Sequence, residues 1–76
     1  MLILYTKNNC QYCEKVKNAF LERSVGYEER NIENDEFLEE AQSKGFRTMP
    51  VLVDTTANVT IPTSDEIVDY INEYAF

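Results

Sequence analysis

Two cysteines, Cys10 and Cys13, have the residue type and the spacing to support chemistry. With two residues between them, both sulfur atoms can lie on one face of a helix, one turn apart and close enough to form a disulfide. An apolar run at residues 2–5 precedes the pair and an amphipathic pattern follows it, which puts Cys10 at a helix N-terminus. Free N–H groups and the helix dipole favour an anion there, so we predict an exposed, nucleophilic Cys10 thiolate and a more buried, resolving Cys13.

Other uses of a cysteine pair stay open at this point. Structural zinc takes four ligands, and the sequence has no histidine and no second cysteine pair, so a zinc site would need two copies of the chain. An iron–sulfur cluster would likewise have to be shared between two chains, and a purely structural pair would not need nearby lysines. We therefore favour thiol–disulfide exchange and expect no metal ligands.

The composition predicts one small globular domain. A length of 76 residues leaves no room for a second domain, and the hydrophobic fraction of 43% with only two glycines and two prolines argues against disorder. The net charge of −7 argues against nucleic acid or an anionic membrane as a partner. The charges are uneven, because residues 28–40 contain seven carboxylates whereas three lysines lie between residues 7 and 17, around the cysteines.

The first residues of the chain bear on its location. The apolar run at residues 2–5 is too short for the core of a signal peptide, and Lys7-Asn8-Asn9 follows it without a small-residue cleavage site. We therefore expect a cytoplasmic protein in a reducing compartment. Paired cysteines in that compartment are more often catalytic or metal-binding than structural.

The hydrophobic pattern predicts the element order βαβαββα. Strands are expected at residues 2–5, 25–32, 51–53 and 58–61, and helices at residues 10–23, from 34 to a stop at Gly45, and from 63 onward with Ile67, Val68, Ile71 and Tyr74 on one side. Asn8 and Asn9 are candidate N-caps of the first helix, Gly26 is its candidate stop, and Thr63 begins a capping box. The fold class is thus α/β, with a four-stranded mixed sheet, helices on both faces and a final hairpin.

Four motifs along the chain resemble the glutaredoxins in their order and spacing. They are Tyr5-Thr6-Lys7, Cys10-Gln11-Tyr12-Cys13, Thr48-Met49-Pro50 and Ser64-Asp65. The resemblance covers essentially all 76 residues and implies a thioredoxin-like fold of glutaredoxin type as a single domain. It also implies a cis peptide bond before Pro50 and a backbone at Thr48 and Met49 that pairs with the substrate like an added strand.

The resemblance further implies a glutathione site. Lys7 and Arg47 would meet the glycine carboxylate, Tyr12 would flank the sulfur, and the N–H groups of Ser64 and Asp65 would hold the glutamyl carboxylate while the Asp65 side chain meets the ammonium. The expected protein is then a monomer with glutathione as co-substrate and no permanently bound cofactor. Its targets would be protein disulfides or glutathionylated proteins, with ribonucleotide reductase as a candidate acceptor.

Some residues depart from the glutaredoxin pattern. Gln11 replaces the usual proline between the cysteines, and Pro62-Thr63 replaces two glycines, which puts a ring and a Cβ atom where glutathione approaches. Gly45-Phe46-Arg47 followed by Met49-Pro50-Val51 resembles the NrdH-redoxins, which take electrons from thioredoxin reductase. A glutathione-dependent oxidoreductase is the preferred interpretation, an NrdH-redoxin-like carrier is the alternative, and a dimeric iron–sulfur or metal carrier is the alternative of another class.

Overall fold

The computed structural model describes residues 1–74, in which four strands form one mixed sheet of order β2-β1-β3-β4. The elements are β1 (Leu2–Thr6), α1 (Gln11–Glu22), β2 (Glu28–Asn31), α2 (Asp35–Ser43), β3 (Val51–Asp54), β4 (Val59–Ile61) and α3 (Ser64–Glu73). Strand β1 pairs parallel with β2 and antiparallel with β3, and β3 forms a hairpin with β4. The predicted element order, mixed sheet and hairpin are confirmed. Within residues 1–74, no helix has the length and apolar character to cross a membrane.

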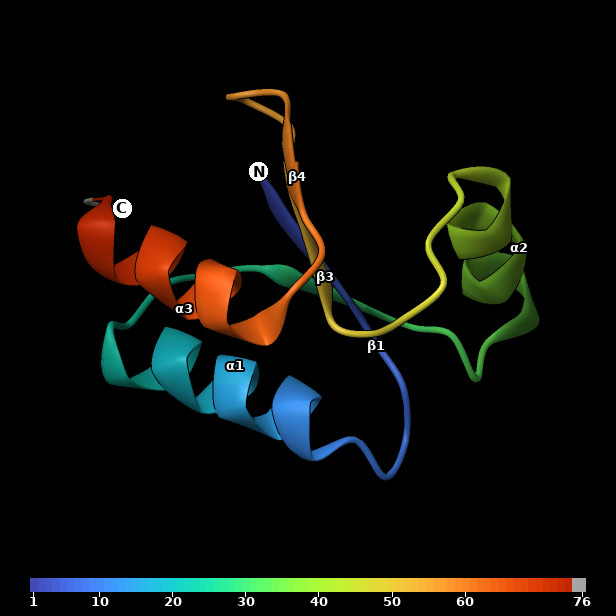
Figure 1. Ribbon diagram of the computed structural model, residues 1–76, viewed down its shortest axis with the longest axis horizontal. Coiled ribbons are helices and arrows are strands. Elements are labelled where there is room, and N and C mark those ends of the chain that lie inside the picture. The colour runs from blue at the N-terminus through green and yellow to red at the C-terminus, as the bar shows by residue number, and fades with distance from the viewer. Residues whose placement is uncertain (75–76) are drawn as a thin grey trace.

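Helices cover both faces of the sheet, with α1 and α3 on one side and α2 on the other (Figure 1). All five residues of β1 are buried as a result, which explains the continuous apolar run at the start of the sequence. The core on the α1 and α3 side contains Leu2, Leu4, Val16, Phe20, Leu52, Ile61, Ile67 and Ile71. The core on the α2 side contains Ile3, Tyr5, Cys10, Cys13, Ala41, Met49 and Val51, so the cysteine pair is part of the packed interior.

Helix α1 ends at Glu22, within one residue of the predicted end, but Gly26 is not its stop. Ser24, rather than Gly26, takes the left-handed conformation after the helix, with φ of 54°. Its N–H donates to the Leu21 carbonyl at 3.1 Å, and the Val25 N–H donates to the Phe20 carbonyl at 3.0 Å. These two hydrogen bonds form a Schellman motif and bring Val25 onto the core beside Phe20. Because residues 24 and 25 close the helix, β2 begins only at Glu28 and not at residue 25 as predicted.

Helix α2 ends with the same motif, but a glycine takes the left-handed position, as predicted. Gly45 has φ of 79°, and its N–H donates to the Gln42 carbonyl at 3.1 Å. The Phe46 N–H donates to the Ala41 carbonyl at 2.9 Å, and the Phe46 ring packs edge-on against Tyr5. The chain therefore contains two equivalent helix ends that differ in whether a side chain occupies the left-handed residue.

The N-termini of α1 and α3 and the residue after α3 correct the sequence prediction. Cys10, not Asn8 or Asn9, is the N-cap of α1, because its sulfur accepts the Cys13 N–H. Thr63 is the N-cap of α3 but its side chain makes no capping hydrogen bond, so the capping-box prediction is wrong; its carbonyl starts the helix by accepting the Ile67 N–H at 3.0 Å. Tyr74 lies after the last turn, exposed, with its ring against Tyr70 instead of in the core.

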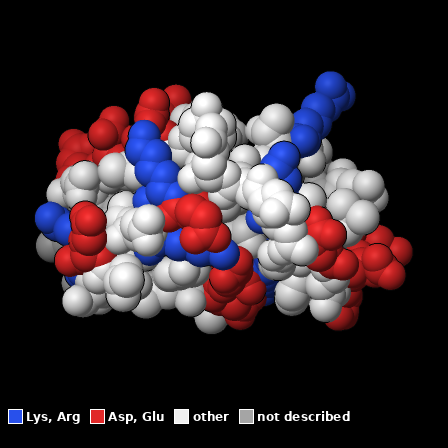
Figure 2. All heavy atoms as spheres, turned by 90° about the horizontal axis from the view of Figure 1, so that it is seen from below, with Lys and Arg blue, Asp and Glu red and all other residues white. Residues whose placement is uncertain are grey.

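Charged side chains of both signs are mixed on the surface (Figure 2). In the acidic segment 28–40, Glu28 and Glu40 both bind Arg30, and Glu29 binds Lys17 at 2.7 Å. Burial raises the pKa of Tyr5, whose hydroxyl donates to Glu40, and that hydrogen bond lowers the pKa of the Glu40 carboxyl. Part of the acidic segment thus joins β1, β2 and α2.

Replacing Ser24 with glycine is expected to stabilise the fold. A left-handed residue with a Cβ atom costs roughly 1–2 kcal/mol, and the extra freedom of glycine in the unfolded chain offsets part of that. We expect Ser24→Gly to raise the free energy of unfolding by about 0.5–1 kcal/mol in denaturant titrations. Gly45→Ala is the matched control and should lower the same quantity. Equal stability of Ser24→Gly and wild type would contradict this account of the α1 end.

The hairpin end of the sheet is held by the buried carboxylate of Asp54. One of its oxygens accepts the backbone N–H groups of Thr56 at 3.0 Å and Ala57 at 3.2 Å, and the other accepts the Tyr70 hydroxyl at 2.6 Å. The hydrogen bond from Tyr70, followed by those from Ala57 and Thr56, lowers the pKa of Asp54 against the opposing effect of its burial. The same hydrogen bond raises the pKa of Tyr70 to about 12. Asp54 therefore links the β3–β4 turn to α3.

Lowering the pH should protonate the Asp54 carboxylate and so weaken its link between the β3–β4 turn and α3. Because the folded-state pKa of Asp54 is lowered, its stabilising contribution is present above its ordinary pKa of about 3.9 and is lost as the pH falls through the folded-state value. Asp54→Asn should destabilise the protein by about 1–3 kcal/mol at neutral pH and reduce the loss of stability between about pH 5 and pH 2. Tyr70→Phe keeps the Asp54 carboxyl but removes its main hydrogen-bond donor. Its loss of stability on acidification should therefore lie between that of the wild type and that of Asp54→Asn. If the free energy of unfolding changes with pH in the same way in the wild type and in Asp54→Asn, the Asp54 carboxylate does not have this role.

Candidate active site

The two cysteines form a disulfide at the start of α1, with their Cα atoms 5.3 Å apart. Cys10 is the last residue before the helix and Cys13 lies in its first turn. The Cys10 sulfur accepts the Cys13 backbone N–H at 3.1 Å, and the Cys10 carbonyl accepts the Glu14 N–H at 3.1 Å. The N-terminal N–H groups of α1 are therefore directed at Cys10, where they favour a thiolate in the reduced protein.

The structure corrects the expected exposure of Cys10. The residue is only 8% exposed, and Cys13 is 1% exposed. Cys10 is covered because its sulfur is bonded to Cys13 and packs in the same buried cluster as Met49. The predicted order of exposure is nevertheless retained, since Cys10 is the more accessible of the two residues.

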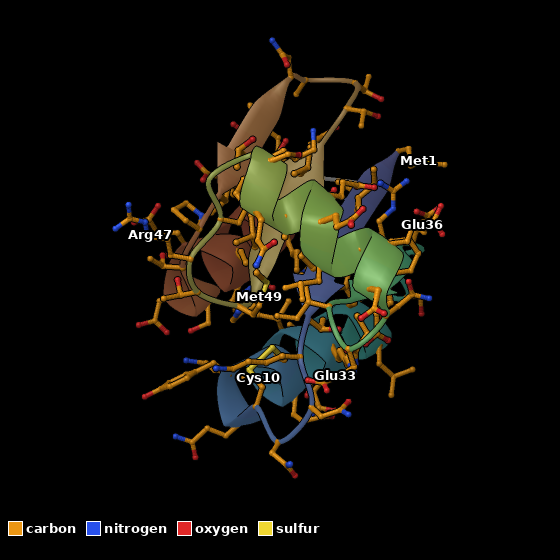
Figure 3. All side chains as sticks on the ribbon, turned by 90° about the vertical axis from the view of Figure 1, so that its right-hand side faces the viewer. Met1, Cys10, Glu33, Glu36, Arg47 and Met49 are labelled. Carbon is orange, nitrogen blue, oxygen red and sulfur yellow. A yellow bond between two sulfur atoms is a disulfide. The ribbon has the colours of Figure 1, made fainter. Side chains whose placement is uncertain are left out.

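The segment before β3 lies next to the disulfide. The carbonyl oxygen of Met49 is 3.9 Å from the Cys10 sulfur, and the Met49–Pro50 peptide bond is cis, as the glutaredoxin resemblance implied. Val51 opposes Tyr5 in the antiparallel β1–β3 pair, so the last residues of β1 and the first residues of β3 lie at the same end of the sheet. In Figure 3, Met49 lies beside Cys10, and the Arg47 side chain extends outward from the same loop.

The residues expected to bind glutathione occupy the segments around this disulfide. Lys7, Tyr12, Arg47 and Thr48 are exposed, whereas Ser64 is half-buried in the first turn of α3. The four exposed side chains lie on the β1–α1 loop, the first turn of α1 and the α2–β3 loop. The structure thus brings Cys10, Cys13, Met49 and Pro50 together. Lys7 and Arg47, which were expected to bind the glycine carboxylate of glutathione, are exposed at the surface.

Asp65 has a partner that the sequence analysis missed. Its carboxylate binds the Lys15 ammonium at 2.6 Å, with the two side chains 81% and 53% exposed. This hydrogen bond raises the pKa of Lys15. An ion pair between residues 50 positions apart leaves no local pattern in the sequence. The only sequence feature that pointed to Lys15 was that it is one of the three lysines around the cysteines.

The glutaredoxin family model matches residues 2–56 of this chain. The chain belongs to the glutaredoxin family. Among its relatives, the glutaredoxin-like protein NrdH of Lactococcus lactis subsp. lactis (strain IL1403) is 42% identical over 53 residues, which are 68% of this chain and 74% of that protein. The glutaredoxin-like protein NrdH of Escherichia coli (strain K12) is 32% identical over 53 residues, 68% of this chain and 65% of the relative.

Solved structures place this glutaredoxin-family chain in the thioredoxin-like fold. The NrdH-redoxin of Escherichia coli superimposes with a TM-score of 0.82 at 26% identity, over 99% of this chain and 95% of its own. That protein is described as glutaredoxin-like with a thioredoxin-like activity profile. The thioredoxin-like protein BC3987 shares the fold with a TM-score of 0.76 at 19% identity, over 93% of this chain and 99% of its own.

For this member of the glutaredoxin family, the geometry predicts which cysteine reacts first. Brief alkylation of the reduced protein should modify Cys10 at least about tenfold faster than Cys13, because Cys10 is more accessible and receives the helix N–H groups. Mass spectrometry of the digested protein measures the ratio. Cys13→Ser should keep the fast-reacting thiol, and Cys10→Ser should leave the slow one. Faster labelling of Cys13 would show that the roles are reversed.

Proposed function

We propose that the protein is an electron carrier of the NrdH-redoxin type. It reduces disulfides of target proteins through Cys10 and Cys13, thioredoxin reductase restores its dithiol form, and ribonucleotide reductase is the candidate acceptor. The observation that carries this proposal is the 42% identity to the NrdH protein of Lactococcus lactis. The thioredoxin-like activity profile of the Escherichia coli NrdH-redoxin, whose structure covers 99% of this chain, supports the same choice.

The ion pair between Lys15 and Asp65 also supports this proposal over the glutathione-dependent interpretation. A glutamyl ammonium at Asp65 would have to compete with Lys15, which already binds the carboxylate at 2.6 Å. The exposed side chains of Pro62 and Thr63 precede this carboxylate where glutaredoxins have two glycines. The relatives give glutathione dependence no support, so the NrdH alternative becomes the main interpretation.

The proposed reaction transfers two electrons in two exchange steps. The Cys10 thiolate attacks a sulfur of the target disulfide, which forms a mixed disulfide and releases one target thiolate. Cys13 then loses its proton and attacks the Cys10 sulfur, which releases the second target thiol and leaves the Cys10–Cys13 disulfide. The 5.3 Å between the two Cα atoms lies within the range that a disulfide spans, so the backbone in this structure fits the bond that the second step forms.

Two reducing systems test the proposal. The oxidised protein is supplied with NADPH and either thioredoxin reductase or glutathione with glutathione reductase, and NADPH consumption is followed with a protein disulfide as the final acceptor. We expect rapid turnover with thioredoxin reductase and slow turnover with glutathione, and none with Cys10→Ser in either system. Rapid turnover with glutathione alone would return the assignment to a glutathione-dependent glutaredoxin.

A variant of Asp65 separates the two interpretations further. If Asp65 held the glutamyl ammonium, Asp65→Asn would cost about 1.5–3 kcal/mol, or roughly tenfold to a hundredfold in glutathione-dependent turnover. Under our proposal, Asp65→Asn leaves that slow turnover unchanged. Asp69→Asn, which removes an exposed carboxylate one turn further along α3, is the matched control.

A further inference from the structure

A residue with a left-handed backbone stands directly before the reactive cysteine. Asn9 has φ of 54°, and Cys10 follows it in an extended conformation, with φ of −120° and ψ of 102°. The chain reverses its direction here, because α1 connects the parallel strands β1 and β2, and only residues 7–9 lie between β1 and Cys10 (Figure 1). The turn at Asn9 therefore sets the direction in which Cys10 enters the helix.

Hydrogen bonds hold the residues on either side of Asn9. The side-chain oxygen of Asn8 accepts a hydrogen bond from the side chain of Asn31, the last residue of β2, at 3.0 Å. The carbonyl of Cys10 accepts the Glu14 N–H at 3.1 Å. An uncommon backbone conformation persists only where the surrounding structure fixes it, and such residues are concentrated at functional sites. These contacts keep Asn9 in its conformation from both sides.

The backbone of Asn9, and not its side chain, makes the residue special. Its side chain is exposed and has no hydrogen-bond partner within residues 1–74. Asparagine adopts the left-handed conformation more readily than most residues that have a Cβ atom, which accounts for its use in this turn. Two further non-glycine residues of the described chain are left-handed, but Ser24 follows the end of α1 and Asn58 lies in the β3–β4 turn.

We propose that Asn9 is a positioning residue for the exchange reaction. The inference rests on the proposed function and assigns a role to a residue outside the cysteine motif. By turning the chain in the left-handed conformation, Asn9 directs the Cys10 sulfur at the Cys13 N–H, which favours the thiolate. In the reduced protein and in the mixed disulfide, no bond joins Cys10 to Cys13. The loop then has to keep the Cys10 sulfur at the helix N-terminus and within reach of Cys13.

Alkylation at two pH values tests the inference. Protein is reduced with dithiothreitol, freed of it and treated briefly with iodoacetamide at about pH 6 and at about pH 9.5, and mass spectrometry of the digest gives the rate constants for Cys10. Because the thiolate is the reacting form, the ratio of the rate constant at the lower pH to that at the higher pH reports how strongly the thiolate is favoured. We expect Asn9→Val, which puts a β-branched side chain in the left-handed region, to lower this ratio about tenfold. Asn9→Gly should keep it within about twofold of the wild type.

Asn58→Val is the matched control, because Asn58 is the same residue type with φ of 55° in a turn that carries no cysteine. It should lower the free energy of unfolding, as Asn9→Val does, and leave the alkylation ratio unchanged. Circular dichroism confirms that each variant is folded, and the milder pair Asn9→Ala and Asn58→Ala replaces the valine pair if either valine variant is not. For Asn9→Ala we expect the ratio to fall about threefold.

The charges around Cys10 are the same in all these variants. They belong to Lys7 in the same loop, Glu14 in the first turn of α1, Glu33 before α2 and Arg47 before β3. A change in the ratio between variants therefore reports the position of the sulfur and not the charge of its surroundings.

A wild-type ratio in folded Asn9→Val, or in Asn9→Ala where that pair is used, would overturn the inference. An equal fall in the matched Asn58 variant would also overturn it, because the cause would then be a general loss of stability. A fall in Asn9→Gly as large as that in Asn9→Val would do the same, since the side chain and not the backbone conformation would be responsible. The protein is reduced chemically, so a protein that thioredoxin reductase does not reduce, but whose ratio falls in Asn9→Val alone, would refute the proposed function and retain this inference.

Discussion

The hydrogen bond from the Cys13 backbone N–H to the Cys10 sulfur joins the chemistry of this protein to its architecture. It exists because α1 begins at residue 11, and α1 begins there because Val16 and Phe20 must pack on the sheet beneath it. The sheet in turn places the start of β3 beside the end of β1, which brings the Met49 carbonyl to the same sulfur. A shift of α1 along the sheet would separate the Cys10 sulfur from the Met49 carbonyl.

Much of this arrangement could be predicted from the sequence. The apolar run of β1, the helical spacing after Cys10 and the left-handed Gly45 all reflect local rules, and they gave the element order and the position of the cysteine pair. The left-handed Ser24 that follows α1 could not be predicted this way, because the packing of the next residue, Val25, against the core offsets the cost of that conformation. That compensation is tertiary and has no local signature.

Prediction of the candidate site from the sequence was limited in the same way, because some of its features depend on contacts between distant segments. The sequence placed Cys10 at a helix N-terminus but predicted it exposed, because the packing of Met49 over the sulfur depends on a segment almost 40 residues away. The resemblance likewise assigned the Asp65 carboxylate to the ammonium of glutathione, whereas in the structure it binds Lys15 on another helix. The burial of Cys10 and the pairing of Asp65 therefore both depend on contacts between elements that are far apart in the sequence.

The two edges of the sheet have a consequence for how the protein meets other chains. Strand β4 has only three residues, and β2 is Glu28–Asn31, a run of charged and polar side chains. Short or charged edges offer a poor template for strand addition by neighbouring molecules, which protects a small sheet from edge-to-edge aggregation. The proposed electron carrier can therefore meet its target proteins without offering the edges of its sheet to unspecific β-pairing.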